Sequence, residues 1–183
     1  NCDRLFSSAK NARHCGHLGR LMEIKTRHWL GLAGVVIVLD QVTKYWALQA
    51  LNYGDPVAIT PGFNLMLVYN TGAAFSLLSD ASGWQRWFFA AVALVVSVVI
   101  TVWLSRLDSD QWWLPAALAL ILGGAIGNFL DRITIGYVID FIQLYYQKWT
   151  WPAFNVADSA ICVGAAMLLL SGWRQNPEES NDN

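Results

Sequence analysis

Two aspartates, Asp140 and Asp158, lie in stretches of the chain that are otherwise apolar. Asp158 is the single charge between Phe154 and Trp173, and Asp140 stands between an isoleucine and a phenylalanine. When two carboxylates come close together, both cannot remain ionised, so the pKa of one rises and that of the other falls. The ionised carboxylate can then take a proton from water while the protonated one polarises a carbonyl group. Such a pair predicts hydrolysis of a peptide bond.

Five further polar residues lie in or beside apolar runs, and each also has a structural interpretation. Asp40 and Lys44 are spaced i, i+4 on a predicted helix, which favours a structural ion pair as much as a chemical role. Asp131 and Arg132 are adjacent, so they either form an interfacial pair or belong to a site. Asn155 either caps the last predicted helix or belongs to the same site.

The structural alternative is weaker for Asp158, because no cation lies near it in sequence, although a water-mediated structural role stays open. The glycines Gly123, Gly124 and Gly127 favour close helix packing. All three histidines precede Trp29, so neither a histidine-dependent protease site nor a zinc site is expected. No metal and no cofactor is therefore predicted.

Membrane-spanning helices must position these residues. Apolar residues make up 55% of the chain and charged residues 14%, whereas a soluble domain has about a quarter charged. Four apolar runs are long enough to cross the hydrocarbon, and they cover approximately residues 29–48, 87–104, 112–130 and 154–173. Tryptophans gather near the ends of these runs, where the membrane interface favours them. The net charge of −1 excludes a general nucleic-acid binder.

The distribution of basic residues predicts that both termini face the cytoplasm. Lys and Arg precede the first run and follow the last, whereas the connector 50–85 contains neither. The helix directions that follow place Asp40, Lys44, Asp131 and Asp158 at one level near the outer leaflet. The sequence therefore predicts that the ionisable groups within the membrane converge.

Residues 1–21 are a polar leader, either upstream sequence or a non-native addition, since Met22 would make a natural start. Residues 22–173 are predicted to form a single integral-membrane domain, followed by a cytoplasmic tail at 174–183. A cleaved signal peptide near residues 25–39 is less compatible, because no A-x-A site follows promptly.

The two outer connectors are not simple turns. Residues 57–79 and 137–151 mix β-branched and aromatic residues, and both predict short strands. The predicted fold is thus an all-α membrane protein, a four-transmembrane-helix bundle with a small β-rich extracytoplasmic interfacial region.

Five blocks of this sequence resemble, in the same order, the motifs of bacterial lipoprotein signal peptidase (signal peptidase II). The resemblance extends from Glu23 to about Trp173. The blocks are Asp40-Gln-Val-Thr-Lys44, Asn70-Thr-Gly-Ala-Ala-Phe75, Gly124-Ala-Ile-Gly-Asn-Phe-Leu-Asp-Arg132, Val138-Ile-Asp140-Phe141 and Phe154-Asn-Val-Ala-Asp158-Ser159.

The resemblance implies an aspartic intramembrane protease of the bacterial plasma (inner) membrane. It would cut prolipoproteins just before a Cys that carries diacylglycerol, with Asp140 and Asp158 as the catalytic pair. The other matching positions would bind substrate or support the site, namely Asn70, Asn128, Arg132, Asn155, Asp131, Asp40 and Lys44. The cyclic-peptide antibiotic globomycin would occupy the same site, and membrane lipid would surround the protein. A monomer without a nucleic-acid partner is expected.

Two other classes of function stay open at the level of the residues. An ion or proton carrier could use Asp40, Lys44 and Asp158 as a relay. A carrier would need polar groups through the full depth of the membrane, whereas the inner halves of the last three runs carry no charge. A packing subunit of a larger complex would tolerate replacement of the acids.

Overall fold

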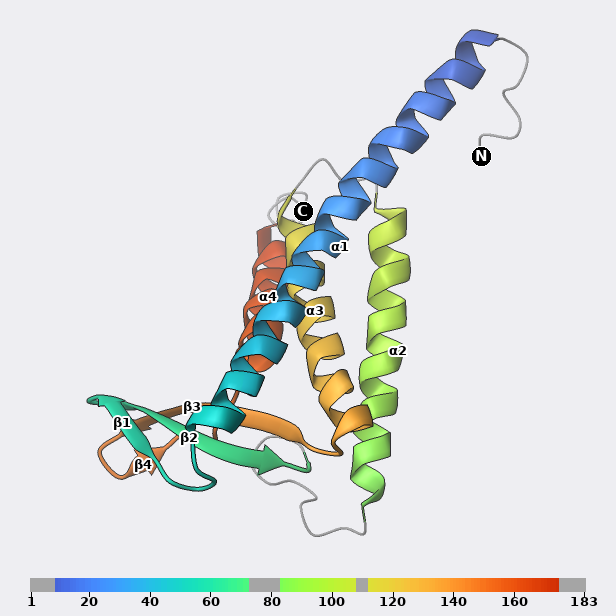
Figure 1. Cartoon of the computed structure of the whole chain (residues 1–183). Coiled ribbons are helices and arrows are strands. Elements are labelled where there is room, and N and C mark those ends of the chain that lie inside the picture. The colour runs from blue at the N-terminus through green and yellow to red at the C-terminus, as the bar shows by residue number, and fades with distance from the viewer. Residues whose placement is uncertain (1–8, 73–82, 108–111, 175–183) are drawn as a thin grey trace, which may run out of the picture.

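The computed structural model describes residues 9–72, 83–107 and 112–174, with side chains from residue 26 to residue 171 within those ranges. Its elements are α1 (Ala9–Ala50), β1 (Val57–Thr60), β2 (Phe63–Asn70), α2 (Trp84–Arg106), α3 (Trp113–Thr134), β3 (Val138–Tyr146), β4 (Trp149–Thr150) and α4 (Val156–Arg174). Figure 1 shows the helices side by side, with successive helices running in opposite directions and the sheet lying across one end. The beginning of α1 and the end of α4 lie at the other end.

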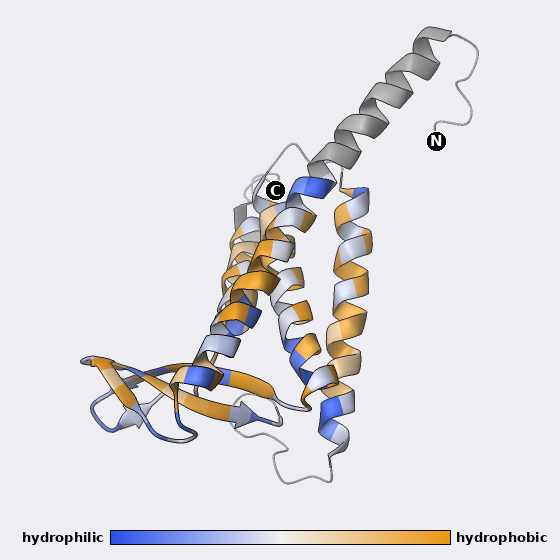
Figure 2. Cartoon of the chain, viewed as in Figure 1, coloured by the Kyte–Doolittle hydropathy of each residue, from blue (hydrophilic) through white to orange (hydrophobic). Residues whose placement is uncertain are grey.

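Three helices are long and apolar enough to cross a membrane, namely Thr26–Ala50 within α1, Trp84–Arg106 and Trp113–Thr134. The apolar stretch of α4, Val156–Ser171, is shorter. A mostly helical membrane protein with a small sheet is therefore confirmed, whereas a crossing by α4 stays a prediction. Hydrophilic segments of α1 and α3 lie toward the end that meets the sheet (Figure 2).

Helix α3 lies at the centre of the bundle and packs against α1, α2 and α4. Its Leu118 and Leu122 are buried with Ala33 of α1 and with Ile100 and Leu104 of α2. The opposite face of α2 is valine-rich and exposed, as expected for a helix whose surface contacts lipid tails.

The glycines of α3 permit this central position, as predicted. A Cβ atom added at Gly123 would lie 2.7 Å from the Val36 Cβ and 2.8 Å from the Ala33 carbonyl oxygen of α1. A Cβ at Gly124 would clash with the Ala157 carbonyl oxygen of α4. Because real Cβ atoms do not approach so closely, the small residues set the distance between these helices.

The strands form one antiparallel sheet in the order β1-β2-β3-β4. In the register between β2 and β3, Val68 pairs with Asp140 and Asn70 pairs with Val138. An isolated bridge between Ile142 and Phe154 joins β3 to the chain just before α4. The prediction of short strands in both connectors is confirmed, although its residues 73–79 lie outside the described part of the chain.

The helix bounds differ from the predicted spans at several ends. α1 begins at Ala9, within the polar leader that was predicted to lie outside the membrane domain. A helix needs regularly spaced apolar residues in order to pack against other helices. It can extend without them once it is nucleated, because each added residue gains a backbone hydrogen bond. α3 continues to Thr134, so Asp131 and Arg132 belong to its last turns. α4 starts at Val156, because the residue before it acts as its cap.

Candidate active site

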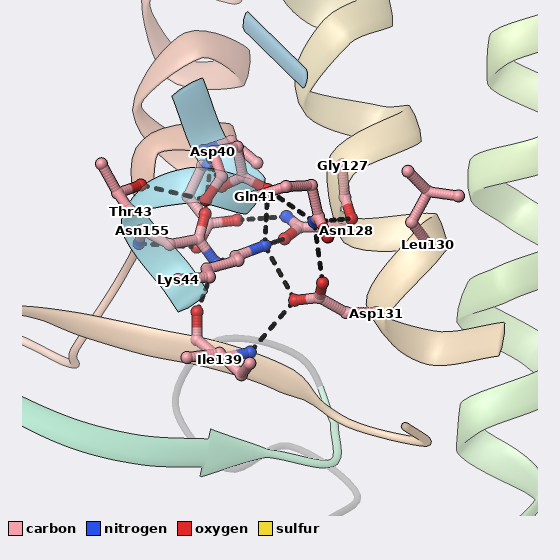
Figure 3. A network of polar contacts seen from close by, with 12 residues as sticks. Asp40, Gln41, Thr43, Lys44, Gly127, Asn128, Leu130, Asp131, Ile139 and Asn155 are labelled. Carbon is pink, nitrogen blue, oxygen red and sulfur yellow. Dashed lines mark hydrogen bonds and ion pairs between the residues drawn. The ribbon is translucent and has the colours of Figure 1, made fainter. Parts of the chain in front are cut away.

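Polar side chains from α1, α3, β3 and the start of α4 meet where the bundle joins the sheet (Figure 3). Of the nine residues singled out from the sequence, Asn70, Arg132 and Asp158 are half-buried. The other six are buried, namely Asp40, Lys44, Asn128, Asp131, Asp140 and Asn155. The structure thus gathers residues that are separated by more than a hundred positions in sequence.

Asp158 is held in the first turn of α4 by a reciprocal pair of hydrogen bonds with Asn155. The Asp158 backbone N–H donates to Asn155 Oδ1 at 2.9 Å, and the Asn155 N–H donates to Asp158 Oδ2 at 3.3 Å. This arrangement is a capping box, in which two unpaired donors at a helix start are satisfied together. The cap predicted for Asn155 is confirmed. A carboxylate here is also favoured by the positive end of the helix dipole.

Two asparagine side chains connect Asp158 to Asp140. Asn155 Nδ2 donates to Asp140 Oδ1 at 2.7 Å and to Asn128 Oδ1 at 3.2 Å. Asn128 Nδ2 then donates to Asp158 Oδ1 at 2.7 Å. The second oxygen of Asp140 accepts from Asn70 Nδ2 at 3.0 Å. The two acids from β3 and α4 therefore share one continuous network of hydrogen bonds.

Asp140 is 1% exposed, and its pKa is raised from 3.8 to about 7. Burial is the largest cause, because it penalises the charged form, and the nearby charge of Asp158 raises the pKa further. Hydrogen bonds from Asn70 and Asn155 and the charge of Lys44 oppose this rise. Asp140 can therefore hold a proton near neutral pH, which is what one member of an acid–base pair of carboxyls requires.

A buried ion cluster centred on Lys44 lies next to this pair. Its ammonium is 2.8 Å from Asp40 Oδ2 and 2.8 Å from Asp131 Oδ2, and it donates to Asn128 Oδ1 at 3.0 Å. The predicted i, i+4 pair of Asp40 and Lys44 is thus formed. Of the two interpretations of Asp131 and Arg132, the structure favours membership of the site, because Asp131 forms its ion pair with Lys44 of α1.

The two acids of the cluster also hold backbone groups of other elements. Asp40 Oδ1 accepts the Ala157 N–H at 2.9 Å, so a carboxylate of α1 helps to cap α4. Asp131 Oδ2 accepts the Ile139 N–H of β3 at 3.2 Å. The ion cluster therefore fixes the two segments that carry Asp140 and Asp158.

Arg132 extends from α3 toward the end of β2. Its guanidinium donates to the carbonyl oxygens of Asn128 at 3.1 Å and Gly72 at 3.4 Å, and it lies 5.4 Å from the centre of the Phe89 ring. These contacts use part of its five N–H donors. A half-buried guanidinium whose contacts within the described residues leave N–H donors over can bind a carbonyl oxygen of a peptide.

Sequence reasoning missed two polar residues that shape the site. Gln41 Nε2 donates to Asp131 Oδ1 at 2.9 Å and to Asp40 Oδ2 at 3.2 Å. Its signal is an amide inside an apolar run, next to an acid. Arg86 donates to the carbonyl oxygens of Arg132 at 2.6 Å and Ile133 at 3.0 Å, which caps the end of α3. No local pattern in the sequence indicates that partner.

Comparisons with known proteins bear on this arrangement. The family model described as signal peptidase (SPase) II matches residues 32–174. A lipoprotein signal peptidase of Acinetobacter baumannii is 53% identical over 156 residues, covering 84% of this chain and 89% of that protein. One from Pseudomonas syringae pv. tomato is 54% identical over 159 residues, covering 86% and 88%. A solved structure described as a bacterial membrane enzyme has a TM-score of 0.75 at 27% identity, covering 85% of this chain and 93% of that one.

Proposed function

Because the chain belongs to the signal peptidase (SPase) II family, we propose that it removes signal peptides from lipid-modified prolipoproteins. The resemblance of its motifs to this family is confirmed, and the chain is a transmembrane protease of a bacterial membrane. The alternative of an ion carrier is not favoured, since the relatives are peptidases. The observation that carries the mechanism is the hydrogen-bonded link between Asp140 and Asp158 through Asn128 and Asn155.

In the proposed reaction the two aspartates form an acid–base pair. Asp158, as the carboxylate at the start of α4, takes a proton from a water molecule whose oxygen attacks the peptide carbonyl carbon before the lipidated Cys. Asp140 supplies its proton to the carbonyl oxygen, which its raised pKa of about 7 makes available near neutral pH. As the tetrahedral intermediate collapses, the C–N bond breaks and the proton on Asp158 passes to the leaving amine. At the same time one of the two hydroxyl groups on that carbon returns its proton to Asp140, which leaves the new carboxylic acid.

The remaining residues divide by what they contact. Asn128 and Asn155 orient the two acids. The ion cluster of Asp40, Lys44 and Asp131 holds the segments that carry them. Asn70 and Arg132 are half-buried and would contact the substrate peptide or an inhibitor such as globomycin. No cofactor or metal is required, and we propose that the chain acts as a monomer.

The membrane arrangement follows from the same proposal. All four helices would span the membrane, with both termini in the cytoplasm and the sheet at the outer surface. This direction is supported by the sheet and the polar site lying at the end opposite to the beginning of α1 (Figures 1 and 2). The scissile bond of a lipidated substrate would then lie beside the acids while its acyl chains stay in the leaflet. Residues 22–173 would form the peptidase domain, after a leader at 1–21 and before a tail at 174–183.

The dyad is tested with purified protein in lipid–detergent micelles and a synthetic peptide that carries a diacylglyceryl Cys. We expect cleavage before the lipidated Cys by the unchanged chain and loss of cleavage in Asp140→Asn and in Asp158→Asn, with normal folding. Asp55→Asn is the matched control, because Asp55 is an exposed aspartate of the connector between α1 and β1. Cleavage retained in either dyad variant would refute the paired mechanism.

A further inference from the structure

We propose that Lys44 is a positioning residue for the reaction, which acts on Asp158 through the side-chain amide of Asn128. The proposal rests on the function proposed for Asp140 and Asp158. Lys44 would then do more than neutralise a neighbouring acid. It would belong to the chain of contacts that orients Asp158, the carboxylate that takes a proton from the attacking water.

Lys44 is 1% exposed and its ammonium group is saturated with partners (Figure 3). Its three N–H bonds match three acceptors, Asp40 Oδ2 and Asp131 Oδ2 at 2.8 Å each and Asn128 Oδ1 at 3.0 Å. The two carboxylates come from different helices and hold the ammonium between them. The third bond therefore points in a fixed direction toward the Asn128 amide.

The amide of Asn128 has one orientation that satisfies its surroundings. Its oxygen accepts from Lys44 Nζ at 3.0 Å and from Asn155 Nδ2 at 3.2 Å, while its nitrogen donates to Asp158 Oδ1 at 2.7 Å. An amide rotated by half a turn would place its NH2 group against the ammonium and its oxygen against the carboxylate. Both contacts would be repulsive, so the lysine keeps the NH2 group of Asn128 directed at Asp158.

This donor matters because the attacking step needs Asp158 in its ionised form. A hydrogen bond from an N–H group favours a carboxylate over the protonated acid, and bonds to charged groups are stronger than neutral ones. The two oxygens of Asp158 are held separately, Oδ1 by Asn128 and Oδ2 by the Asn155 N–H. Loss of the first contact would leave the carboxylate held at Oδ2 alone and less fixed in orientation.

Among the described residues, two other charged or titratable groups face Asp158, and one of them, Asp140, also responds to the charge of Lys44, which lowers its pKa. Arg132 of α3 and Asp140 of β3 interact with Asp158 electrostatically, and the polar groups of Asn128 and Asn155 bond to it directly. An effect of Lys44 on the orientation of Asp158 must therefore reach it through Asn128, whereas its effect as a charge is exerted over a distance. If Lys44 acts through Asn128, the effect of replacing Lys44 disappears once the Asn128 amide is removed. If Lys44 acts as a long-range charge, the effect persists.

The test is a double-mutant cycle of Lys44→Met and Asn128→Ser, measured as kcat and KM for the lipidated peptide across the acidic and neutral pH range. Asp40→Asn/Lys44→Met is included because it removes one buried acid together with the lysine. Tyr45→Phe is the matched control, since its side chain is on the same helix and is 67% exposed. Folding of each variant is checked by its thermal unfolding.

We expect Lys44→Met to lower kcat about ten- to a hundredfold with little change in KM, as for the loss of one hydrogen bond to a charged group. Because the charge of Lys44 also lowers the pKa of Asp140, the alkaline limb of the profile should move to higher pH by that separate route. In the Asn128→Ser background the same substitution should have little further effect on kcat, because residues that act through one another are not additive.

The proposal is overturned if a folded Lys44 variant keeps the kcat of the unchanged chain, or if its effect on kcat adds fully to that of Asn128→Ser. It is also overturned if both lysine variants fail to fold, since Lys44 would then serve folding rather than orientation. Failure of the proposed function itself is distinguishable, because Asp140→Asn or Asp158→Asn would then retain cleavage.

Discussion

The strictest test of the close packing around the ion cluster is Gly127→Ala on α3. A Cβ at this position would lie 2.6 Å from Asp40 Oδ2, 3.2 Å from Asp40 Cγ and 3.4 Å from the Ala157 Cβ. Ordinary contact begins at 3.4 Å, so the carboxylate would have to move by about 0.8 Å, the difference between 3.4 and 2.6 Å. That carboxylate holds both the Lys44 ammonium at 2.8 Å and the Ala157 N–H at 2.9 Å.

The free energy of unfolding should fall for two reasons. Overpacking a tight interior costs about 1–3 kcal/mol, and losing a hydrogen bond to a charged group costs about 1.5–3 kcal/mol. We expect a loss of at least about 2 kcal/mol, which corresponds to about 4 °C or more in Tm for a chain of this length. Cleavage should fall as well, because the displaced Asp40 no longer holds the start of α4, where Asp158 lies.

The assay is thermal unfolding of the purified protein in micelles, with cleavage of the lipidated peptide measured in parallel. Gly34→Ala on α1 is the matched control, because a Cβ there meets nothing within 4 Å. Alanine is favoured over glycine inside a helix by about 1 kcal/mol, so the control should keep or raise Tm. Equal Tm and equal cleavage in the two variants would refute the packing argument.

Three further predictions concern the pH dependence of cleavage and the end of α3. Cleavage should decline as the pH rises through about 7, because the pKa of Asp140 is raised to about 7 and the proposed reaction needs its protonated form to polarise the carbonyl. Asn70→Ala removes a bond that lowers this pKa, so the alkaline limb of kcat should move to higher pH; an unchanged or lower midpoint would contradict the assignment. Arg86→Met should lower Tm by a few degrees, since it removes two bonds to α3 carbonyls whose loss costs about 1 kcal/mol each, whereas Arg106→Met, at the exposed end of α2, should not.

The convergence of the polar residues could be predicted from the sequence, because charges inside apolar helices are costly and alternate helix directions fix their depth. The four helices and the strands of both connectors could also be predicted, because the length of an apolar run and the types of its residues are local properties of the sequence. The cap at Asn155 is also local, as it depends on a residue three positions away.

The choice of partners could not be predicted, because it depends on how each helix is rotated about its axis. Asp131 is next to Arg132 in sequence, yet it pairs with Lys44 at 2.8 Å across the bundle. The contact of Asp40 with the Ala157 N–H joins residues 117 positions apart, at a place where Gly127 of α3 leaves room for both Asp40 and Ala157. Arg86 reaches the end of α3 for a similar reason.

The pairing of Asp40 with Lys44 has a consequence for how the protein is made. During synthesis α1 leaves the ribosome before α3 and α4 exist, so neither Asp131 nor the Ala157 N–H can yet compensate its charges. Because the two groups lie one turn apart and contact each other at 2.8 Å, α1 carries its own counter-ion into the bilayer. Later helices then add to a nearly neutral segment, and the candidate site is complete only when α4, which carries Asp158, has packed against α3.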